Sequence, residues 1–383
     1  MNIPRALKAV VEDKIKHSNK GVVIYGPRQA GKTTLVTDSI RSLGLRALTV
    51  NGDQTRYIDI LTSRDAEKMK SLVAGYDMLF VDEAQRIPEI GINLKIILDE
   101  IPSVRLIVTG SSSLDLASKI AKPLTGRMWV YRLYTIACME LSGLFNTAQL
   151  DATLEERLVY GSYPEVFSIV AREQKREYLE DLCDAYLYKD LLMFGGIANS
   201  SKIRDLLRVL AFQIGSQVSL TEVSTTIGMG KDTVARYIDL LEKSFVIFRL
   251  HGLHRNLRKE VSKMDKIFFY DLGVRNTLIG NMHGIQDRND IGQLWENFCI
   301  IERMKYLAYT KQYASWYFWR THTGAELDYV EDRGGKLHGF EMKWGMGKAK
   351  VPTAWQTTYP DASWSFVNRS NYLPFMLPHA SGR

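Results

Sequence analysis

The stretch GPRQAGKT, residues 26–33, fits the pattern G-x-x-x-x-G-K-[ST]. It lies between an apolar run, GVVIY, and an amphipathic segment, KTTLVTDSIRSL. A glycine-rich turn between a strand and a helix lets backbone N–H groups surround phosphate oxygens at the helix N-terminus. The sequence therefore predicts a phosphate-binding loop here.

The residues of this loop have expected positions around a bound nucleotide. The Lys32 ammonium is expected to reach the β- and γ-phosphates and to act in catalysis, and the Thr33 hydroxyl is expected to be a Mg²⁺ ligand. ATP and Mg²⁺ are thus the predicted ligands. The predicted nucleotide-binding residues of the loop and its flank are Gly26, Pro27, Arg28, Gln29, Ala30, Gly31, Lys32, Thr33 and Thr34.

A second motif, DMLFVDEAQ at residues 77–85, ends an apolar run in two acids. Asp82 is expected to hold Mg²⁺ through water, and Glu83 to polarise the water that attacks the γ-phosphate. An acid directly after the metal aspartate indicates a hydrolase. The alternative is a helix N-terminus, where acidic residues are electrostatically favoured.

A third apolar run, LIVTGSSS at residues 106–113, ends in small polar residues. In parallel sheets of this kind, the carboxyl end of a neighbouring strand faces the γ-phosphate. A hydroxyl at Ser111 or Ser112 is therefore a candidate contact to it, and Ser111 is assigned to the nucleotide site. A serine-rich turn or a helix N-cap explains the same residues.

The pattern of apolar residues divides the chain into three regions. From residue 21 to about 134, apolar runs alternate with helical patterns, which predicts a doubly wound parallel sheet. Helical patterns predominate from about 138 to 245. Strands return after residue 266, around one long helix near residues 290–309. The fold class is α/β, with expected domains at residues 1–137, 138–265 and 266–383.

Composition indicates a folded, multidomain protein of a reducing compartment. The 383 residues are 45% hydrophobic, and the cysteines Cys138, Cys183 and Cys299 show neither paired nor metal-ligand spacing. No apolar run reaches the roughly 20 residues of a membrane-spanning helix, so a cytoplasmic protein without a membrane partner is expected. The net charge of +7 permits contact with nucleic acid without requiring it.

The middle region has the order of elements of a winged helix-turn-helix. Three helical patterns between residues 203 and 243 precede the apolar run FVIFRL, and Ser219 and Thr221 can cap the second helix. A recognition helix would present side chains near its amino end to a DNA major groove. The candidate groove-contacting residues are Lys231, Asp232, Thr233 and Arg236. A basic segment at residues 249–266 follows them and could contact phosphates. Alternatively the module only packs, since Val234, Ile238 and Leu241 form an apolar stripe.

Taken together, the motifs resemble the AAA+ ATPases, specifically the bacterial and archaeal branch that carries a C-terminal domain of unknown function. The resemblance continues through GSYPEV at 161–166, YLYKDLL at 186–192, FFYDLGVRN at 268–276 and WENF at 295–298. It implies an ATPase that forms homo-oligomers. In such proteins an arginine of one subunit completes the neighbour's site, and Arg127 in PLTGRMW resembles this catalytic residue. The alternative is a basic residue that opens a β-strand.

Near the end of the chain, FEMKW has the E-x-K form of PD-(D/E)xK nuclease active sites. The resemblance extends to Asp328 in AELDYV and Glu296 in QLWENF, and it implies a nuclease-like domain. Asp328, Glu341 and Glu296 would be Mg²⁺ ligands, and Lys343 would steady the attacking water. Because side chains alternate along a strand, Glu341 and Lys343 share one face, so an ion pair is the simpler alternative.

Two functions remain open from the sequence. The first is a Mg²⁺-dependent ATPase that acts at DNA through the winged helix and the nuclease-like domain. The second is an ATP-gated protein-interaction switch with an unidentified protein partner, in which the C-terminal fold is catalytically inactive. Salt-dependent DNA binding distinguishes the first from the second.

Overall fold

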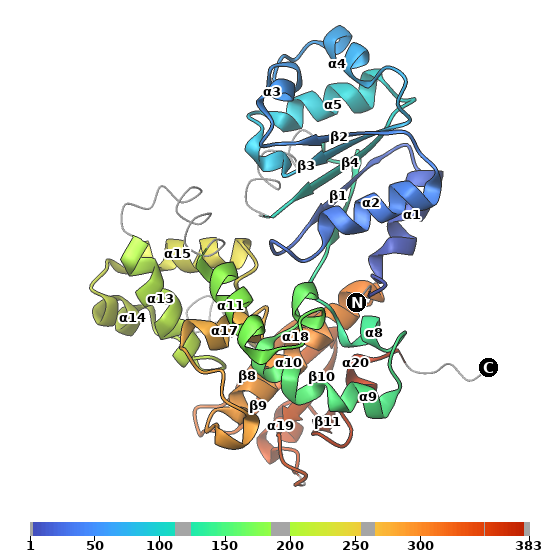
Figure 1. The fold of residues 1–383 in the computed structure, drawn as a ribbon. Coiled ribbons are helices and arrows are strands. Elements are labelled where there is room, and N and C mark those ends of the chain that lie inside the picture. Colours follow the sequence, from blue (N-terminus) through green and yellow to red (C-terminus); the bar gives the residue numbers. More distant parts are fainter. Residues whose placement is uncertain (1–2, 112–123, 185–199, 254–264, 348, 379–383) are drawn as a thin grey trace, which may run out of the picture. The chain divides into compact units, whose positions relative to one another are not determined.

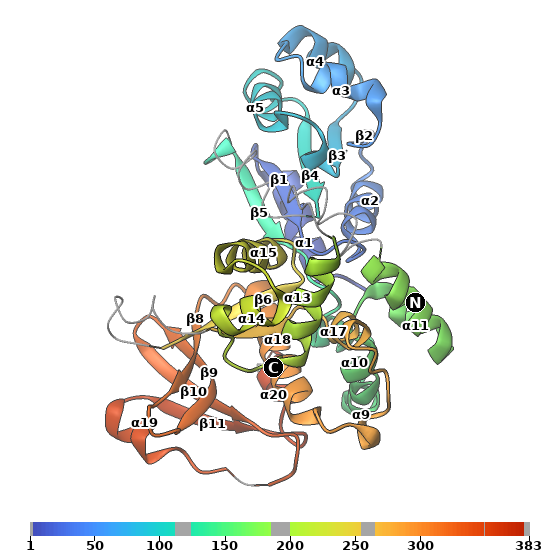
Figure 2. The same ribbon diagram turned by 90° about the vertical axis from the view of Figure 1, so that its left-hand side faces the viewer.

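The structure is a computed structural model of the chain (Figures 1 and 2). It divides into two compact units: Asn2–Ile136 with Lys243–Phe245, and Ala137–Glu242 with Val246–Arg383. The described residues are 3–111, 124–184, 200–253, 265–347 and 349–378.

A five-stranded sheet of order β2-β3-β4-β1-β5 forms the centre of the first unit, and all its pairings are parallel. The predicted doubly wound sheet is confirmed within this unit. Strands β1, β3 and β4 read as nearly continuous apolar runs because both faces of the sheet are covered. The strands are β1 (Gly21–Tyr25), β2 (Ala47–Asn51), β3 (Met78–Asp82), β4 (Arg105–Gly110) and β5 (Met128–Arg132).

Helices cover both faces of this sheet (Figure 1). One group packs on β1 and β4, and a second group closes a core that contains Leu61, Met69 and Leu94 with Val23 and Val81 of the sheet. The first group is α1 (Leu7–His17) and α2 (Lys32–Leu43). The second is α3 (Thr55–Leu61), α4 (Ala66–Val73) and α5 (Ile90–Glu100).

The second unit contains a six-stranded mixed sheet of order β11-β10-β9-β8-β6-β7. Because β6 pairs in parallel with β8, this sheet crosses the domain boundary expected at residue 265, and that boundary does not separate two compact units. The strands are β6 (Ile247–Gly252), β7 (Lys266–Phe269), β8 (Ser315–Arg320), β9 (Glu326–Arg333), β10 (Lys336–Met342) and β11 (Ser363–Val367).

Helices surround this sheet, and the long predicted helix is present as α18 (Ile291–Tyr309), which packs on β7 and β10. On another part of the sheet, Trp355 of α19 (Thr353–Thr358) packs with Leu327 and Val330. The other helices are α8 (Cys138–Leu141), α9 (Thr147–Ala152), α10 (Leu154–Tyr160), α11 (Arg172–Leu182), α13 (Ser200–Phe212), α14 (Leu220–Ile227), α15 (Lys231–Lys243), α17 (Leu272–Leu278) and α20 (Leu373–Met376).

Helices α13, α14 and α15 precede the antiparallel pair β6/β7, in the order expected from the middle region. Ser219 caps α14 by accepting the Glu222 N–H at 3.3 Å, as predicted. Val234, Ile238 and Leu241 are buried. Residues 254–264 of the basic segment lie outside the described part of the chain, as do Ser112 and the whole of YLYKDLL.

Two motifs that the sequence left without a chemical role meet at one buried carboxylate. Asp271 caps α17 by accepting the N–H of Gly273 at 2.9 Å, and it also accepts the N–H of Ser162 at 2.8 Å. Gly161 must be glycine, since a Cβ there would lie 2.0 Å from the Asp271 carboxylate. Burial raises the pKa of Asp271 to about 6. GSYPEV and FFYDLGVRN are therefore parts of one structural junction.

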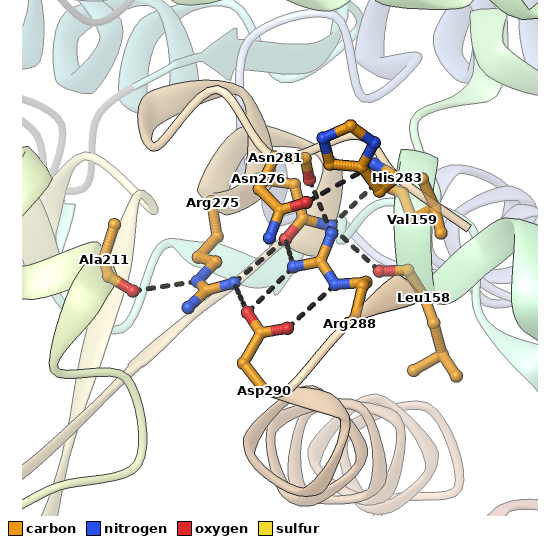
Figure 3. Close-up of polar contacts among 9 residues, drawn as sticks. All are labelled: Leu158, Val159, Ala211, Arg275, Asn276, Asn281, His283, Arg288 and Asp290. Atoms are coloured by element: carbon orange, nitrogen blue, oxygen red, sulfur yellow. Dashed lines mark hydrogen bonds and ion pairs between the residues drawn. The ribbon is translucent and has the colours of Figure 1, made fainter. Parts of the chain in front are cut away.

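A buried polar network continues this junction (Figure 3). The Asn276 side chain donates to the carbonyls of Leu158 and Val159 at 3.0 and 2.8 Å. Arg275 and Arg288 both pair with Asp290, at 2.5 and 2.8 Å. Since a buried guanidinium is costly unless it is paired, these contacts tie α10 and α17 to the start of α18.

Candidate functional site

The phosphate loop connects β1 to α2, and two of its glycines are required by geometry. A Cβ on Gly26 would lie 1.9 Å from the Leu133 carbonyl oxygen, and Gly31 has a left-handed φ of 91° at the start of α2. Between them, the backbone turns so that the Ala30 N–H bonds the Pro27 carbonyl at 3.3 Å. Arg28 is half-buried, and Gln29, Thr33 and Thr34 are exposed at the loop surface.

Lys32 is buried inside this loop. Its ammonium donates to the carbonyls of Gly26 and Pro27 at 3.0 and 2.8 Å, and the residue is 5% exposed. Burial lowers the pKa of Lys32 to about 8, although Glu83 and Asp82 favour the charged form. Two backbone carbonyl oxygens thus bind the Lys32 ammonium at the place where phosphate oxygens are expected to bind it.

Asp82, at the end of β3, contacts side chains of helix α2 and of the neighbouring strand β4. Its carboxylate accepts the Thr33 hydroxyl at 2.7 Å and the Thr109 hydroxyl from β4. Thr109 was missed in the sequence, because the pattern predicts the strand but not which side chain at its end faces the neighbour. A hydroxyl and a carboxylate in contact are ligands of the kind that Mg²⁺ takes, so Thr33 and Asp82 fit this ion.

Glu83 follows in a left-handed conformation, with φ 50°. Its carboxylate accepts the Ser111 hydroxyl at 3.2 Å and the Gln85 amide, which also donates to Ser111 at 3.1 Å. Ser111 therefore contacts the candidate base directly. Gln85 was not predicted as a site residue, although it stands inside the quoted motif DMLFVDEAQ.

Arg127 lies at the other end of the first sheet from its own phosphate loop. Gly21, the first residue of β1, donates its N–H to the Arg127 carbonyl at 3.0 Å, whereas the loop follows Tyr25. The intervening strand spans roughly 3.3 Å per residue. The Arg127 guanidinium pairs with Asp99 at 2.8 Å, and its side chain is 41% exposed. Arg127 therefore does not join the nucleotide site of its own chain.

In the second unit, the predicted acids Asp328 and Glu341 lie on the neighbouring antiparallel strands β9 and β10. The register ends with the pair Phe340 and Tyr329, and Glu341 and Asp328 are the next residues along the two strands. Burial and then the Glu341 carboxylate raise the pKa of Asp328 to about 6. Asp328 also accepts the Met342 N–H at 2.7 Å. The expected juxtaposition of these two acids is present.

Glu341 and Glu296, two of the predicted acids, each form an ion pair with a lysine. Lys343 lies 2.8 Å from Glu341, which is the ion pair considered above. Glu296 lies 3.0 Å from the ammonium of Lys266, which also contacts Glu326 at 2.6 Å. Burial lowers the pKa of Lys266, but the nearby carboxylates of Glu296, Asp328 and Glu326 raise it by more, so the pKa lies above its ordinary value.

Lys266 was missed because a charged residue at the start of a strand suggests an exposed position, yet this residue is 4% exposed. Its ammonium supplies the positive charge that a metal would bring to Glu296. Among the residues that the structure describes, no group of three or more His, Cys, Asp or Glu side chains is arranged to hold a metal ion. Glu296, Asp328 and Glu341 do not fit the expected three-carboxylate Mg²⁺ site.

Comparison with protein families divides the chain in a similar way. Residues 18–142 match a model described as an AAA domain. Residues 151–283 and 291–367 match two domains of unknown function, DUF8612 and DUF4143. The first match supports an AAA-type P-loop ATPase that binds and hydrolyses ATP, and the last one supports a C-terminal domain of the DUF4143 type.

Relatives extend over most of the chain. An uncharacterized protein of Mycobacterium tuberculosis is 28% identical over 331 residues, which cover 85% of this chain and 71% of that protein. Another from Methanocaldococcus jannaschii is 26% identical over 332 residues, covering 76% and 69%.

Similarity to solved structures is weaker. The Walker-type ATPase of Pyrococcus abyssi aligns with a TM-score of 0.46 and 12% identity, over 71% of this chain and 94% of that one. The Thermotoga maritima RuvB Holliday junction branch migration motor aligns with a TM-score of 0.33 and 16% identity, over 63% and 87%. These two likenesses carry no argument about function.

In the described ranges, no helix is both long and apolar enough to cross a membrane.

Proposed function

We propose that this chain hydrolyses ATP with Mg²⁺ held at Thr33 and Asp82. The observation that carries the proposal is the direct contact between Thr33 of the loop and Asp82 of β3, at 2.7 Å, with Glu83 as the next residue. Mg²⁺ would neutralise charge on the phosphate oxygens. Mg²⁺-dependent phosphate release from ATP, abolished by EDTA, is the experiment that tests it.

The chain's own residues supply the rest of the chemistry. Glu83 accepts a proton from the attacking water, whose oxygen forms a bond to the γ-phosphorus as the bond to the ADP oxygen breaks. Lys32 and the loop N–H groups stabilise the negative charge on the phosphates. The Gln85 and Ser111 hydrogen bonds hold the Glu83 carboxylate in one orientation until substrate binds.

The same chain is proposed to contact DNA through α15. Its amino-terminal residues Lys231 and Asp232 are exposed, as is Arg236 one turn further on, while the apolar stripe faces the core. The pair β6/β7 follows α15 as the strands of a wing would. Exposed cations at the amino end of such a helix suit a groove contact flanked by phosphates.

Replacing Lys231 and Arg236 together by alanine is expected to weaken DNA binding. The dependence of log affinity on log salt should flatten by roughly one unit per lost phosphate contact. Fluorescence anisotropy of labelled duplex DNA over a salt series measures it. The control, Lys68→Ala with Lys350→Ala, removes the same charge from exposed positions elsewhere. If the Lys231→Ala, Arg236→Ala variant binds DNA as tightly as the unchanged chain, or if neither binds DNA, the protein-interaction switch is favoured.

For the C-terminal domain we propose a nuclease-like arrangement that does not cut. The support is Lys266, whose ion pair with Glu296 uses a carboxylate that the predicted metal site would need. Lys343 is likewise paired with Glu341.

We therefore expect linear, circular and single-stranded DNA to remain intact with Mg²⁺ or Mn²⁺, with or without ATP. Gel analysis of the products measures this, beside an Asp328→Ala, Lys343→Ala control. Metal-dependent cleavage that the control loses would overturn the proposal and restore a catalytic role to Asp328.

A further inference from the structure

A cavity of about 780 Å³ opens between α18, α20 and the strands β9, β10 and β11, of which β11 is the edge of the sheet. It lies within the second unit, apart from the acidic cluster. His338 and Phe340 of β10 point toward it, on the strand face opposite Glu341. Its volume is within the range of small-molecule sites, roughly 300–1,000 Å³.

The polar wall of this cavity is built around one fully buried carboxylate. Glu331 is 0% exposed and accepts from Arg303 at 2.7 Å and from Arg333 at 2.6 Å. Arg303 also donates to the Phe375 carbonyl at 2.7 Å and lies over the Phe375 ring. The two guanidiniums are therefore held in place without a ligand, which lowers the cost of binding one.

The cavity carries more positive than negative charge. Besides Arg303 and Arg333, it is lined by Lys336, and its lining contains Glu331 alone as an acid. In the described part of the chain, the Lys336 ammonium has neither a hydrogen bond nor an ion pair, and the residue is exposed. Three cations against one carboxylate leave two positive charges, which match a phosphate monoester dianion.

A neutral hydrogen-bonding group lies beside these cations. The two ring nitrogens of His338 bond the Ser365 and Ser363 hydroxyls at 2.8 and 2.6 Å. Burial lowers the pKa of His338, which favours the neutral ring. One nitrogen then donates and the other accepts, and the serine that accepts keeps its own O–H free to donate to a ligand.

Aromatic side chains beside Arg303 form another part of the lining, the aromatic wall. Phe340 and Phe375 lie with ring centroids 4.8 Å apart, and Phe366 also lines the cavity. A flat ring can stack on such a surface, while the charged end of the same ligand reaches the guanidiniums and Lys336.

We propose that this cavity binds a nucleoside monophosphate, with its base on the aromatic wall and its phosphate at Arg333 and Lys336. The ligand is either a free mononucleotide or the phosphorylated end of a strand, which share this chemistry. The site is independent of the ATP site proposed above, and nothing about ATP turnover follows from it.

Isothermal titration of AMP into the Lys32→Ala chain tests the proposal, because the phosphate loop then contributes no binding. Saturable binding of AMP is expected, with adenosine and inorganic phosphate each at least about tenfold weaker. Lys336→Glu should weaken AMP binding by at least about tenfold, since it reverses a charge at the phosphate. Lys350→Glu, an exposed lysine outside the cavity, should leave it unchanged.

A 5′-phosphorylated oligonucleotide that binds more tightly than AMP, and loses affinity with Lys336→Glu, would identify a strand end as the ligand and support the site. No AMP binding in the millimolar range, or binding that Lys336→Glu leaves intact, would overturn it. Lys336 is exposed at the start of β10, so its variants should fold, which thermal melting checks.

Discussion

Replacing Lys32 by alanine is expected to leave no detectable ATP turnover, whereas Glu83→Gln is expected to retain ATP and hydrolyse it slowly. Lys32 is the buried cation of the phosphate loop, so its loss removes phosphate binding itself. Glu83 acts only when water attacks, and losing such a base costs roughly 10²- to 10⁴-fold. Phosphate release and equilibrium binding of fluorescent ATP, measured on both variants, separate these roles.

The exposed lysine Lys68 supplies a control, since Lys68→Ala removes a charge from α4 without touching the loop.

A further readout is the number of protons taken up when ATP binds. Because burial lowers the pKa of Lys32 to about 8, part of it is neutral at that pH, and phosphates favour its charged form. ATP binding should take up protons near pH 8 but not near pH 6. If Glu83→Gln hydrolysed ATP at the wild-type rate, a residue other than Glu83 would have to be the general base.

Arg127→Ala is expected to lower ATP turnover by about 10³-fold with little change in ATP affinity. An arginine supplied by a neighbouring subunit stabilises charge in the transition state only. Within its own chain, Arg127 is at the far end of β1 and paired with Asp99. Since exposed ion pairs are weak, a neighbour's nucleotide can draw the guanidinium away from Asp99.

Mixing experiments test the shared site. Arg127→Ala subunits mixed with Lys32→Ala subunits should regain activity, because a mixed oligomer contains some interfaces with an intact loop and an intact arginine. The matched control Asp99→Asn removes the ion pair but keeps the arginine, and it should remain active. If no mixture recovers turnover, Arg127 is only a basic residue before β5.

The nucleotide site was largely predictable because its motif combines a local backbone shape with a fixed order of residues. The motifs predict Gly26, Lys32, Thr33 and Asp82 as residues of this candidate site. Thr109 was not, since its contact with Asp82 depends on the pairing of β1, β3 and β4, which sequence spacing does not show.

The acidic cluster was harder to predict for a related reason. The sequence predicted that a turn between two strands would bring Asp328 and Glu341 together, and the two acids do lie on adjacent antiparallel strands. Lys266 comes from the distant strand β7, and its burial among Glu296 and Glu326 is a property of the assembled sheet. A pattern of single residues along one strand carries no information about such a partner.

The mixed sheet also constrains how the chain is made. Strand β6 pairs with β8, and β7, α17 and α18 are synthesised between the two strands. At roughly 5–20 residues per second, β6 and its first partner β7 leave the ribosome some seconds before β8, the second partner of β6, exists. During that time the edge of β6 can pair with the wrong strand, and the Asp271 junction with Gly161 cannot close until residue 271 has emerged. A nascent chain stalled before β8 should therefore be a substrate for chaperones, whereas one that has passed β11 should not.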